Sequence, residues 1–430
     1  MAVTMTAAPA ERASFGPMII IGILFFIFGF VTWLNGPLIT FVKLAFQVDD
    51  FLAFLVPSAF YLSYLFLSLP ASLVLRRTGM KKGMALGLFV MAIGAFLFGQ
   101  FVSMRMFGGA LTGLFVIGAG LSLLQTASNP YISILGPIDS AAQRIAFMGI
   151  CNKLAGILAP LLIGTLVLHG IGDLDQKVKA ADPVTREQLL NEFASRIHTP
   201  YMVIAGVLVL LAIWIARSSL PDIEAASANS TPVIAGDKGA ARGIMHFPHL
   251  WLGVICLFVY VGVEVMAGDA IGTYGAGFHL PLDQTKYFTG ITLAAMLLGY
   301  VAGLLLIPRL VSQQTYLAIS AVLGVIFAIA AFLTHGYVSV GFVALLGFAN
   351  AMMWPAIFPL AIKGLGALTE RGSALLVMSI CGGGLIPPLF AHLKEHIDFQ
   401  LAFLIVVVPC YLYILYYGLA GHRVGQRPAR

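Results

Sequence analysis

The feature that most constrains this chain is a series of apolar, nearly uncharged stretches that follow one another along its 430 residues. A bilayer core of about 30 Å is crossed by roughly 20 apolar residues in helical conformation. Only 10% of the residues are charged, whereas soluble domains carry about 25%. The sequence therefore predicts a polytopic membrane protein. Because the stretches are continuously apolar and do not alternate, they predict helices and exclude a β-barrel.

Twelve stretches bounded by charges, glycines or prolines predict twelve transmembrane helices and an all-α fold. The predicted helices are 16–40, 52–75, 84–103, 107–135, 142–169, 200–216, 249–276, 287–307, 314–334, 337–362, 372–393 and 399–418. Residues 171–199 contain enough Glu, Lys and Leu for a short amphipathic helix, or they form a solvated loop. Small residues precede the first apolar run and do not follow it, so this run is predicted to stay in the mature protein and not to be cleaved as a signal peptide.

The longest polar stretch, residues 219–248, separates two sets of six predicted spans. It predicts a cytoplasmic linker between an N-terminal bundle, residues 1–218, and a C-terminal bundle, residues 249–430. Lys and Arg concentrate in the segments that are cytoplasmic if both termini are inside, as the positive-inside rule requires. This clustering accounts for the net charge of +6, so we expect membrane lipid and no nucleic acid as a partner.

The two halves resemble each other weakly, most clearly between the fourth and tenth spans. Gln125 and Asn129 are matched 225 positions later by Asn350 and Trp354. Residues four positions apart share one face of a regular helix, and amides beside an aromatic ring suit a hydroxyl-rich ring. These four side chains are therefore predicted to line one central cavity between the halves, as in transporters built from repeats. Hydrogen bonding between helices is the alternative role for the amides.

Three ionisable residues, Lys153, Glu264 and Asp269, lie inside predicted spans. Such a residue costs about 2.5–3.5 kcal/mol or more at the bilayer centre and usually marks an ion or substrate pathway. A structural salt bridge, or hydration near a helix end, is the alternative. Glu264 and Asp269 are about 140° apart on a regular helix, so they share a face only if the helix unwinds. Gly262 and Gly268 permit such a break.

Six segments carry a resemblance to a known family. They are GFVTWLNGPLITFVK (29–43), LQTASNPYISILGP (124–137), CNKLAGILAP (151–160), YVGVEVMAGD (260–269), WPAIFPLAIKGLG (354–366) and GSALLVMSICGGGLIPPLF (372–390). These segments resemble the fucose/glucose/galactose sugar symporters of the major facilitator superfamily. The resemblance implies two six-helix bundles that alternate access, in a monomer of a bacterial inner membrane. It also implies sugar uptake driven by a coupling ion, H⁺ or Na⁺, with no cofactor.

The resemblance also implies roles for single residues. Gln125 stands where the fucose branch has Glu, which favours a glucose or galactose substrate. The helix 5 asparagine of the fucose branch is matched by Asn152, and Tyr260 and Glu264 resemble the helix 7 stretch of glucose/galactose members. The candidate substrate-binding residues are therefore Trp33, Asn35, Gln125, Asn129, Asn152, Tyr260, Asn350 and Trp354.

One departure from the family pattern leaves the coupling mechanism open. The helix 1 carboxylate of the family is replaced by Gly36. We therefore expect ion coupling at Glu264 first and Asp269 second, with Lys153 as counter-charge. Aligning the two halves places Gly36 opposite Asp269, as though the acid had been exchanged between them. The space at Gly36 also makes N-acetylglucosamine a candidate substrate.

Other classes of function remain as alternatives. The missing acid is compatible with a uniporter that lacks ion coupling, and efflux transporters share the same fold. A membrane-embedded enzyme would need clustered His, Asp or Ser, whereas the nine His are scattered. The four Cys lie inside predicted spans without metal-ligand spacing, so the sequence predicts neither a disulfide framework nor a metal site.

Overall fold

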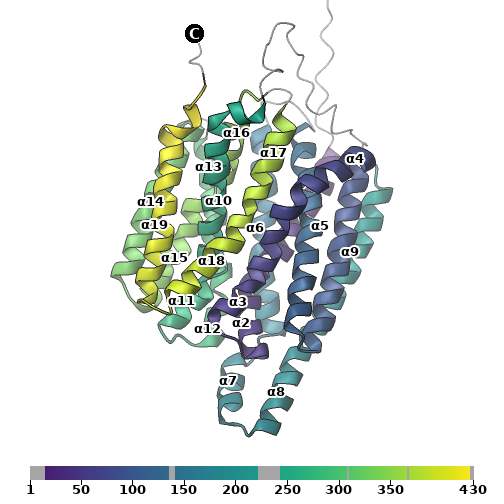
Figure 1. The fold of residues 1–430 in the computed structure, drawn as a ribbon, viewed down its shortest axis with the longest axis vertical. Helices are drawn as coiled ribbons and strands as arrows, with labels where there is room; N and C mark the ends of the chain where they lie inside the picture. Colours follow the sequence, from purple (N-terminus) through teal and green to yellow (C-terminus); the bar gives the residue numbers. More distant parts are fainter. Residues whose placement is uncertain (1–14, 135–140, 221–242, 308, 366–367, 427–430) are drawn as a thin grey trace, which may run out of the picture.

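The computed structural model describes residues 15–134, 141–220, 243–307, 309–365 and 368–426, and within these ranges every regular element is helical. The N-terminal half contains α1 (Phe15–Thr32), α2 (Asn35–Phe46), α3 (Asp50–Ala53), α4 (Leu55–Ser103), α5 (Phe107–Ile134), α6 (Ala141–Leu166), α7 (Ile171–Ala180), α8 (Pro183–Ser195) and α9 (His198–Arg217). The C-terminal half contains α10 (Pro248–Gly268), α11 (Ile271–Gly277), α12 (Leu282–Thr285), α13 (Phe288–Leu306), α14 (Gln313–Leu333), α15 (Gly336–Asn350), α16 (Met353–Ile362), α17 (Thr369–Met378), α18 (Gly382–Leu393) and α19 (Phe399–Leu419). Figure 1 shows the helices of the two halves side by side. Most of the predicted linker lies outside the described residues.

Twelve crossings are present, which confirms the predicted all-α fold. Eleven helical segments of the described chain are long and apolar enough to span a membrane, and one of them, Asp50–Ser103, contains two predicted helices. Its main part, α4, has 49 residues, which corresponds to about 74 Å and more than twice the bilayer core. Gly79 divides it with φ 77° and ψ 167°, a conformation that glycine adopts without strain.

The two ends of the molecule differ. Helices α7 and α8 form a hairpin that projects beyond the spans, and we call this the hairpin end (Figure 1). Residues 171–199 thus form two helices. Asp182 caps α8 by accepting hydrogen bonds from the backbone N–H groups of Val184 and Thr185, as a helix N-cap does. At the opposite end, the linker end, α9 finishes and α10 begins.

Four of the crossings are interrupted inside the membrane. The breaks fall between α1 and α2, between α10 and α11, between α15 and α16, and at a short 3₁₀ turn between α17 and α18. Irregular backbone at membrane depth is tolerated where it packs inside the protein or lines a cavity. These breaks therefore indicate where a functional site can lie.

The halves contact each other closely at the hairpin end. The hydroxyl of Ser58 donates to the carbonyl of Gly384 at 2.6 Å, and the ammonium of Lys286 donates to the carbonyl of Leu168 at 2.8 Å. Asp50 pairs with Lys394 across the halves. These contacts hold the two halves together at the hairpin end.

Candidate functional site: a polar cavity between the halves

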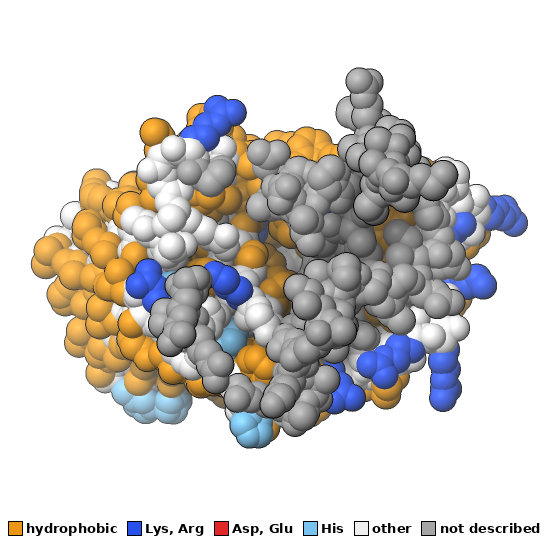
Figure 2. Space-filling view, turned by 90° about the horizontal axis from the view of Figure 1, so that it is seen from above, with side chains coloured by type: hydrophobic (Ala, Val, Ile, Leu, Met, Phe, Trp, Pro, Cys, Tyr) orange, Lys and Arg blue, Asp and Glu red, His pale blue; other side chains and the backbone are white. Residues whose placement is uncertain are grey.

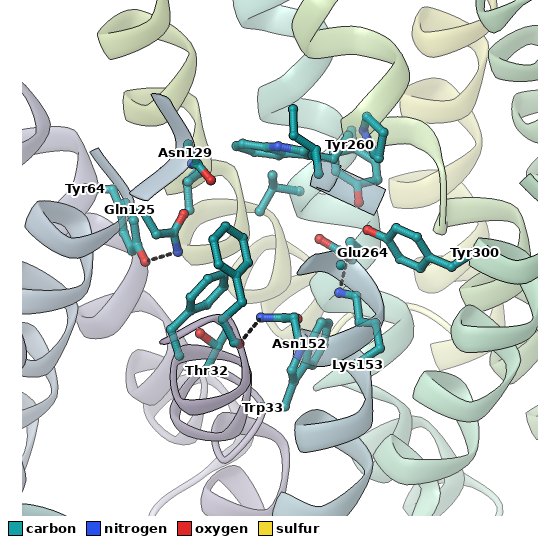
Figure 3. A pocket seen from close by; sticks show the side chains of 18 of the residues that line it. Thr32, Trp33, Tyr64, Gln125, Asn129, Asn152, Lys153, Tyr260, Glu264 and Tyr300 are labelled. Carbon is teal, nitrogen blue, oxygen red and sulfur yellow. Dashed lines mark hydrogen bonds and ion pairs between the residues drawn. The ribbon is translucent and has the colours of Figure 1, made fainter. Parts of the chain in front are cut away.

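A cavity of about 120 Å³ lies between the two halves at mid-membrane depth. Helices α1, α4, α5 and α6 contribute from one half, and α10, α13 and α16 from the other. The polar and aromatic side chains that line it include Thr32, Trp33, Tyr61, Tyr64, Gln125, Asn129, Asn152, Lys153, Tyr260, Glu264, Tyr300 and Trp354. Figure 3 shows most of these side chains pointing toward one another.

One wall of the cavity presents amides from α5. Gln125 donates from Nε2 to the hydroxyl of Tyr64 at 2.9 Å, and Asn129 lines the cavity one turn further along. Sequence reasoning missed Tyr64 and its neighbour Tyr61. A weak signal was available, because these tyrosines lie three positions apart and therefore share one face of α4.

Trp33 forms the floor of the cavity. Its Nε1 donates to Oδ1 of Asn152 at 3.3 Å. A Cβ atom at Gly156 would lie 2.6 Å from Cδ1 of the Trp33 indole. A Cβ atom at Gly268 would lie 2.4 Å from Cζ3 of the same indole. Any larger residue at either position would clash with the indole. Both positions therefore need glycine for this close packing.

A buried ion pair joins the two halves beside this floor. Lys153 of α6 contacts Glu264 of α10 at 2.9 Å, and the two side chains are only 7% and 13% exposed. The Lys153 ammonium also lies 4.3 Å from the centroid of the Trp33 ring, an arrangement that the electron-rich face of an indole favours. Figure 3 places Tyr260 and Tyr300 beside Glu264, and Tyr300 is a further residue that sequence reasoning missed.

Asp269 lies outside the cavity, closer to the hairpin end. It is 1% exposed, and neither carboxyl oxygen has a hydrogen-bond partner among the described residues. A Cβ at Gly36 would lie 3.2 Å from Oδ1 of Asp269 and 2.4 Å from the hydroxyl of Thr289. The carboxyl group of Asp269 thus lies against the position at which the family resemblance expected one on helix 1.

The helix break falls directly after Gly268, one of the two glycines expected to permit it, and not at Gly262. Helix α10 ends at Gly268. The backbone N–H groups of Asp269 and Ala270 both donate to the carbonyl of Val265, at 2.7 and 3.2 Å, which ends the regular ladder. Gly268 also provides the close contact with Trp33 described above.

Two of the predicted substrate-binding residues do not line the cavity. Asn350 is fully buried and accepts a hydrogen bond from Tyr411 at 2.9 Å, whereas Trp354 lines the cavity. The four-residue spacing fails here because α15 ends at Asn350 and α16 begins at Met353, so the two side chains no longer share a helical face. Asn35 lies directly after the break between α1 and α2, is 1% exposed, and is likewise absent from the lining.

Comparison with known proteins finds one matching family and several similar transporters. The profile of the family described as Major Facilitator Superfamily matches residues 21–388. A glucose/galactose transporter of Brucella abortus is 32% identical over 408 residues, covering 93% of each chain. The L-fucose-proton symporter of Escherichia coli is 29% identical, covering 90% of this chain and 89% of that protein. A crystal structure of the transporter FucP in the outward conformation superposes with a TM-score of 0.74 at 26% identity, covering 97% of this chain and all of that one.

Proposed function

This chain belongs to the Major Facilitator Superfamily, and we propose that it is a secondary transporter that takes up a monosaccharide by alternating access. The substrate is of the glucose, galactose or N-acetylglucosamine class, and H⁺ or Na⁺ drives its uptake. The observation that carries the proposal is the cavity between the halves, where amides, aromatic rings and one ion pair converge. One chain supplies the whole lining, so a monomer suffices.

The orientation follows from the distribution of charge. Exposed or half-exposed cations gather at the linker end, at Arg76, Arg77, Lys81, Lys82, Arg217, Arg309, Lys363, Arg371 and Arg423. Figure 2 looks onto this end and shows Lys and Arg side chains around its rim. The positive-inside rule places such an end in the cytoplasm. We therefore propose a multi-pass protein of a bacterial inner membrane with both termini inside, in an inward-facing conformation.

The proposed sugar site combines amides with aromatic rings. Gln125, Asn129 and Asn152 offer donors and acceptors to hydroxyl groups. Trp33 and Trp354 offer flat apolar surfaces to a pyranose ring. The relatives named for glucose and galactose, and the relative named for L-fucose, are similar along nearly the whole chain, which supports a monosaccharide substrate.

The proposed coupling site is Glu264 with Lys153. The two residues belong to different halves, so movement of the halves into an outward-facing state would draw them apart. A buried carboxylate without its counter-charge is costly, and binding a cation removes that cost. Glu264 would therefore bind the coupling ion when the hairpin end is open, and Lys153 would displace the ion when it closes. Asp269 would be a second acid, reached only when the hairpin end opens.

A panel of radiolabelled sugars in proteoliposomes tests the substrate class. We expect counterflow of one sugar of the proposed class, and accumulation of that sugar only under an inward H⁺ or Na⁺ gradient.

Gln125→Ala should weaken sugar affinity by about 1–3 kcal/mol, because it leaves polar groups of the bound sugar and of Tyr64 without a partner. Asn350→Ala is the matched control, since Asn350 bonds Tyr411 away from the cavity, and it should leave affinity unchanged.

Two results would contradict the proposal. Equilibration without accumulation, under every ion gradient, would identify an uncoupled facilitator. Counterflow of none of the sugars, together with transport of apolar drugs outward, would identify an efflux transporter of the same fold.

A further inference from the structure

A cluster of metal-ligating side chains lies at the hairpin end, far from the central cavity. His392 is in the last turn of α18 and Glu395 and His396 are in the turn that follows, and all three are exposed. Their potential ligand atoms lie within 4.8 Å of one another, and the rings of the two histidines have centroids 4.9 Å apart. We propose that these residues bind a transition-metal ion of the Zn²⁺ class, although the sequence predicted no metal site.

The chemistry of the three side chains fits this class of ion. Two imidazoles and one carboxylate bind Zn²⁺ in many open sites, with a water in the fourth position. A tetrahedral site with bonds of about 2.0 Å has neighbouring ligand atoms about 3.3 Å apart. Rotation of exposed side chains can close the remaining gap. Mg²⁺ and Ca²⁺ prefer all-oxygen ligands, so the two imidazoles select against them.

The three side chains are available as ligands. None of them takes part in a hydrogen bond or ion pair within the part of the chain that the structure describes. The packing around the segment comes instead from its neighbours, because Lys394 pairs with Asp50 of α3 and the ring of Phe51 lies edge-on to His392 at 6.5 Å.

This placement links the metal site to the closed hairpin end. Lys394 lies between the ligands His392 and Glu395, and its partner Asp50 belongs to the other half and also contacts Lys43 at 2.5 Å. A bound ion would fix the turn that presents Lys394 and would favour the closed arrangement. Occupancy should therefore slow transport, a consequence that rests on the proposed transport function.

Calorimetric titration of the purified full-length protein tests the binding. The affinity tag must contain no histidines, because a polyhistidine tag binds the same ions. We expect one Zn²⁺ per chain and no binding of Mg²⁺. His392→Ala and His396→Ala should each weaken Zn²⁺ binding by at least about tenfold, the lower end of what loss of even a supporting residue costs a metal site. His335→Ala, at another exposed histidine of the described chain, is the matched control and should bind as the wild type does.

Absence of Zn²⁺ binding would overturn the proposal, and so would equal binding by the double variant His392→Ala/His396→Ala. The effect on transport is measured separately, as Zn²⁺ inhibition of sugar counterflow that EDTA reverses in the wild type and that is absent in the double variant. Unchanged counterflow with the site occupied would overturn the link to closure. Failure of the sugar proposal would leave the calorimetric result intact, so the two failures are distinguishable.

Discussion

Glu264 and Asp269 are five residues apart in one membrane crossing, yet their surroundings are opposite. Glu264 lines the cavity and has a cationic partner at 2.9 Å. Asp269 is sealed between the halves and has no hydrogen-bond partner among the described residues. The break that ends α10 at Gly268 separates them. The comparison indicates that counting intramembrane acids does not identify the coupling site. Whether an acid has a partner that it can gain or lose is more informative.

Movement of the two halves would affect the surroundings of the two acids differently. The pair of Glu264 and Lys153 joins two halves that must separate, so its electrostatic energy changes with conformation. Asp269 forms no salt bridge among the described residues, so separation of the halves would break none at this acid. We therefore expect the coupling to depend strongly on Glu264 and weakly on Asp269.

The largest expected effect comes from neutralising each acid in turn. Glu264→Gln should abolish ion-driven accumulation and keep sugar exchange, because the side chain can no longer bind and release an ion. Asp269→Asn should keep most accumulation, because Asp269 has no salt bridge for the movement to break and an Asn side chain has nearly the same shape. Uptake and counterflow in the same proteoliposomes measure both. The opposite pattern, with accumulation lost only in Asp269→Asn, would assign the coupling to Asp269.

A smaller effect is expected on stability when the cation is removed. Lys153→Met leaves Glu264 buried without its counter-charge, and breaking a buried pair in this way typically costs about 3–5 kcal/mol. Thermal unfolding in detergent measures the loss. The double variant Lys153→Met/Glu264→Gln leaves no unpaired buried charge. It should therefore recover most of that stability while remaining unable to accumulate sugar. If the single variant unfolds like the wild type, the pair contributes little and the comparison fails.

Much of the fold could be predicted from the sequence. Each crossing is an apolar stretch with few or no charges, and its composition alone specifies a membrane helix, as α5 and α19 illustrate. Gly262 and Gly268 indicated that the crossing of Glu264 and Asp269 can break, but the exact positions of the four interruptions depend on tertiary contacts and could not be predicted. The break at Asp269 coincides with the approach of Gly36, and that between α15 and α16 moves Asn350 away from Trp354. A helical wheel assumes an unbroken helix and therefore fails at these positions.

The candidate site was predicted in part for the same reason. Gln125 lies on an unbroken helix and lines the cavity as its spacing suggested, and Asn152 and Lys153 line it from α6. Tyr64 and Tyr300 were missed because tyrosine is common in apolar helices and acquires meaning only from a polar neighbour. The cluster proposed to bind metal was missed, although His392, Glu395 and His396 stand at i, i+3 and i+4 in the sequence, a spacing that brings side chains together on one helical turn.

The smallest expected effect changes the surroundings of Asp269 and leaves Glu264 untouched. A Cβ at Gly36 would lie 2.4 Å from the hydroxyl of Thr289, so Gly36→Ala should disfavour the closed hairpin end by about 1–3 kcal/mol, as overpacking does. Thr289→Ala removes the crowding hydroxyl, and the double variant should recover part of the loss. Distances between spin labels on α8 and on the turn after α18 would report the opening. Because the Glu264 site is unchanged, sugar should still accumulate, at a slower rate. Loss of accumulation in Gly36→Ala, with normal counterflow, would show that Asp269 and Gly36 belong to the coupling site, and the contrast between the two acids would no longer hold.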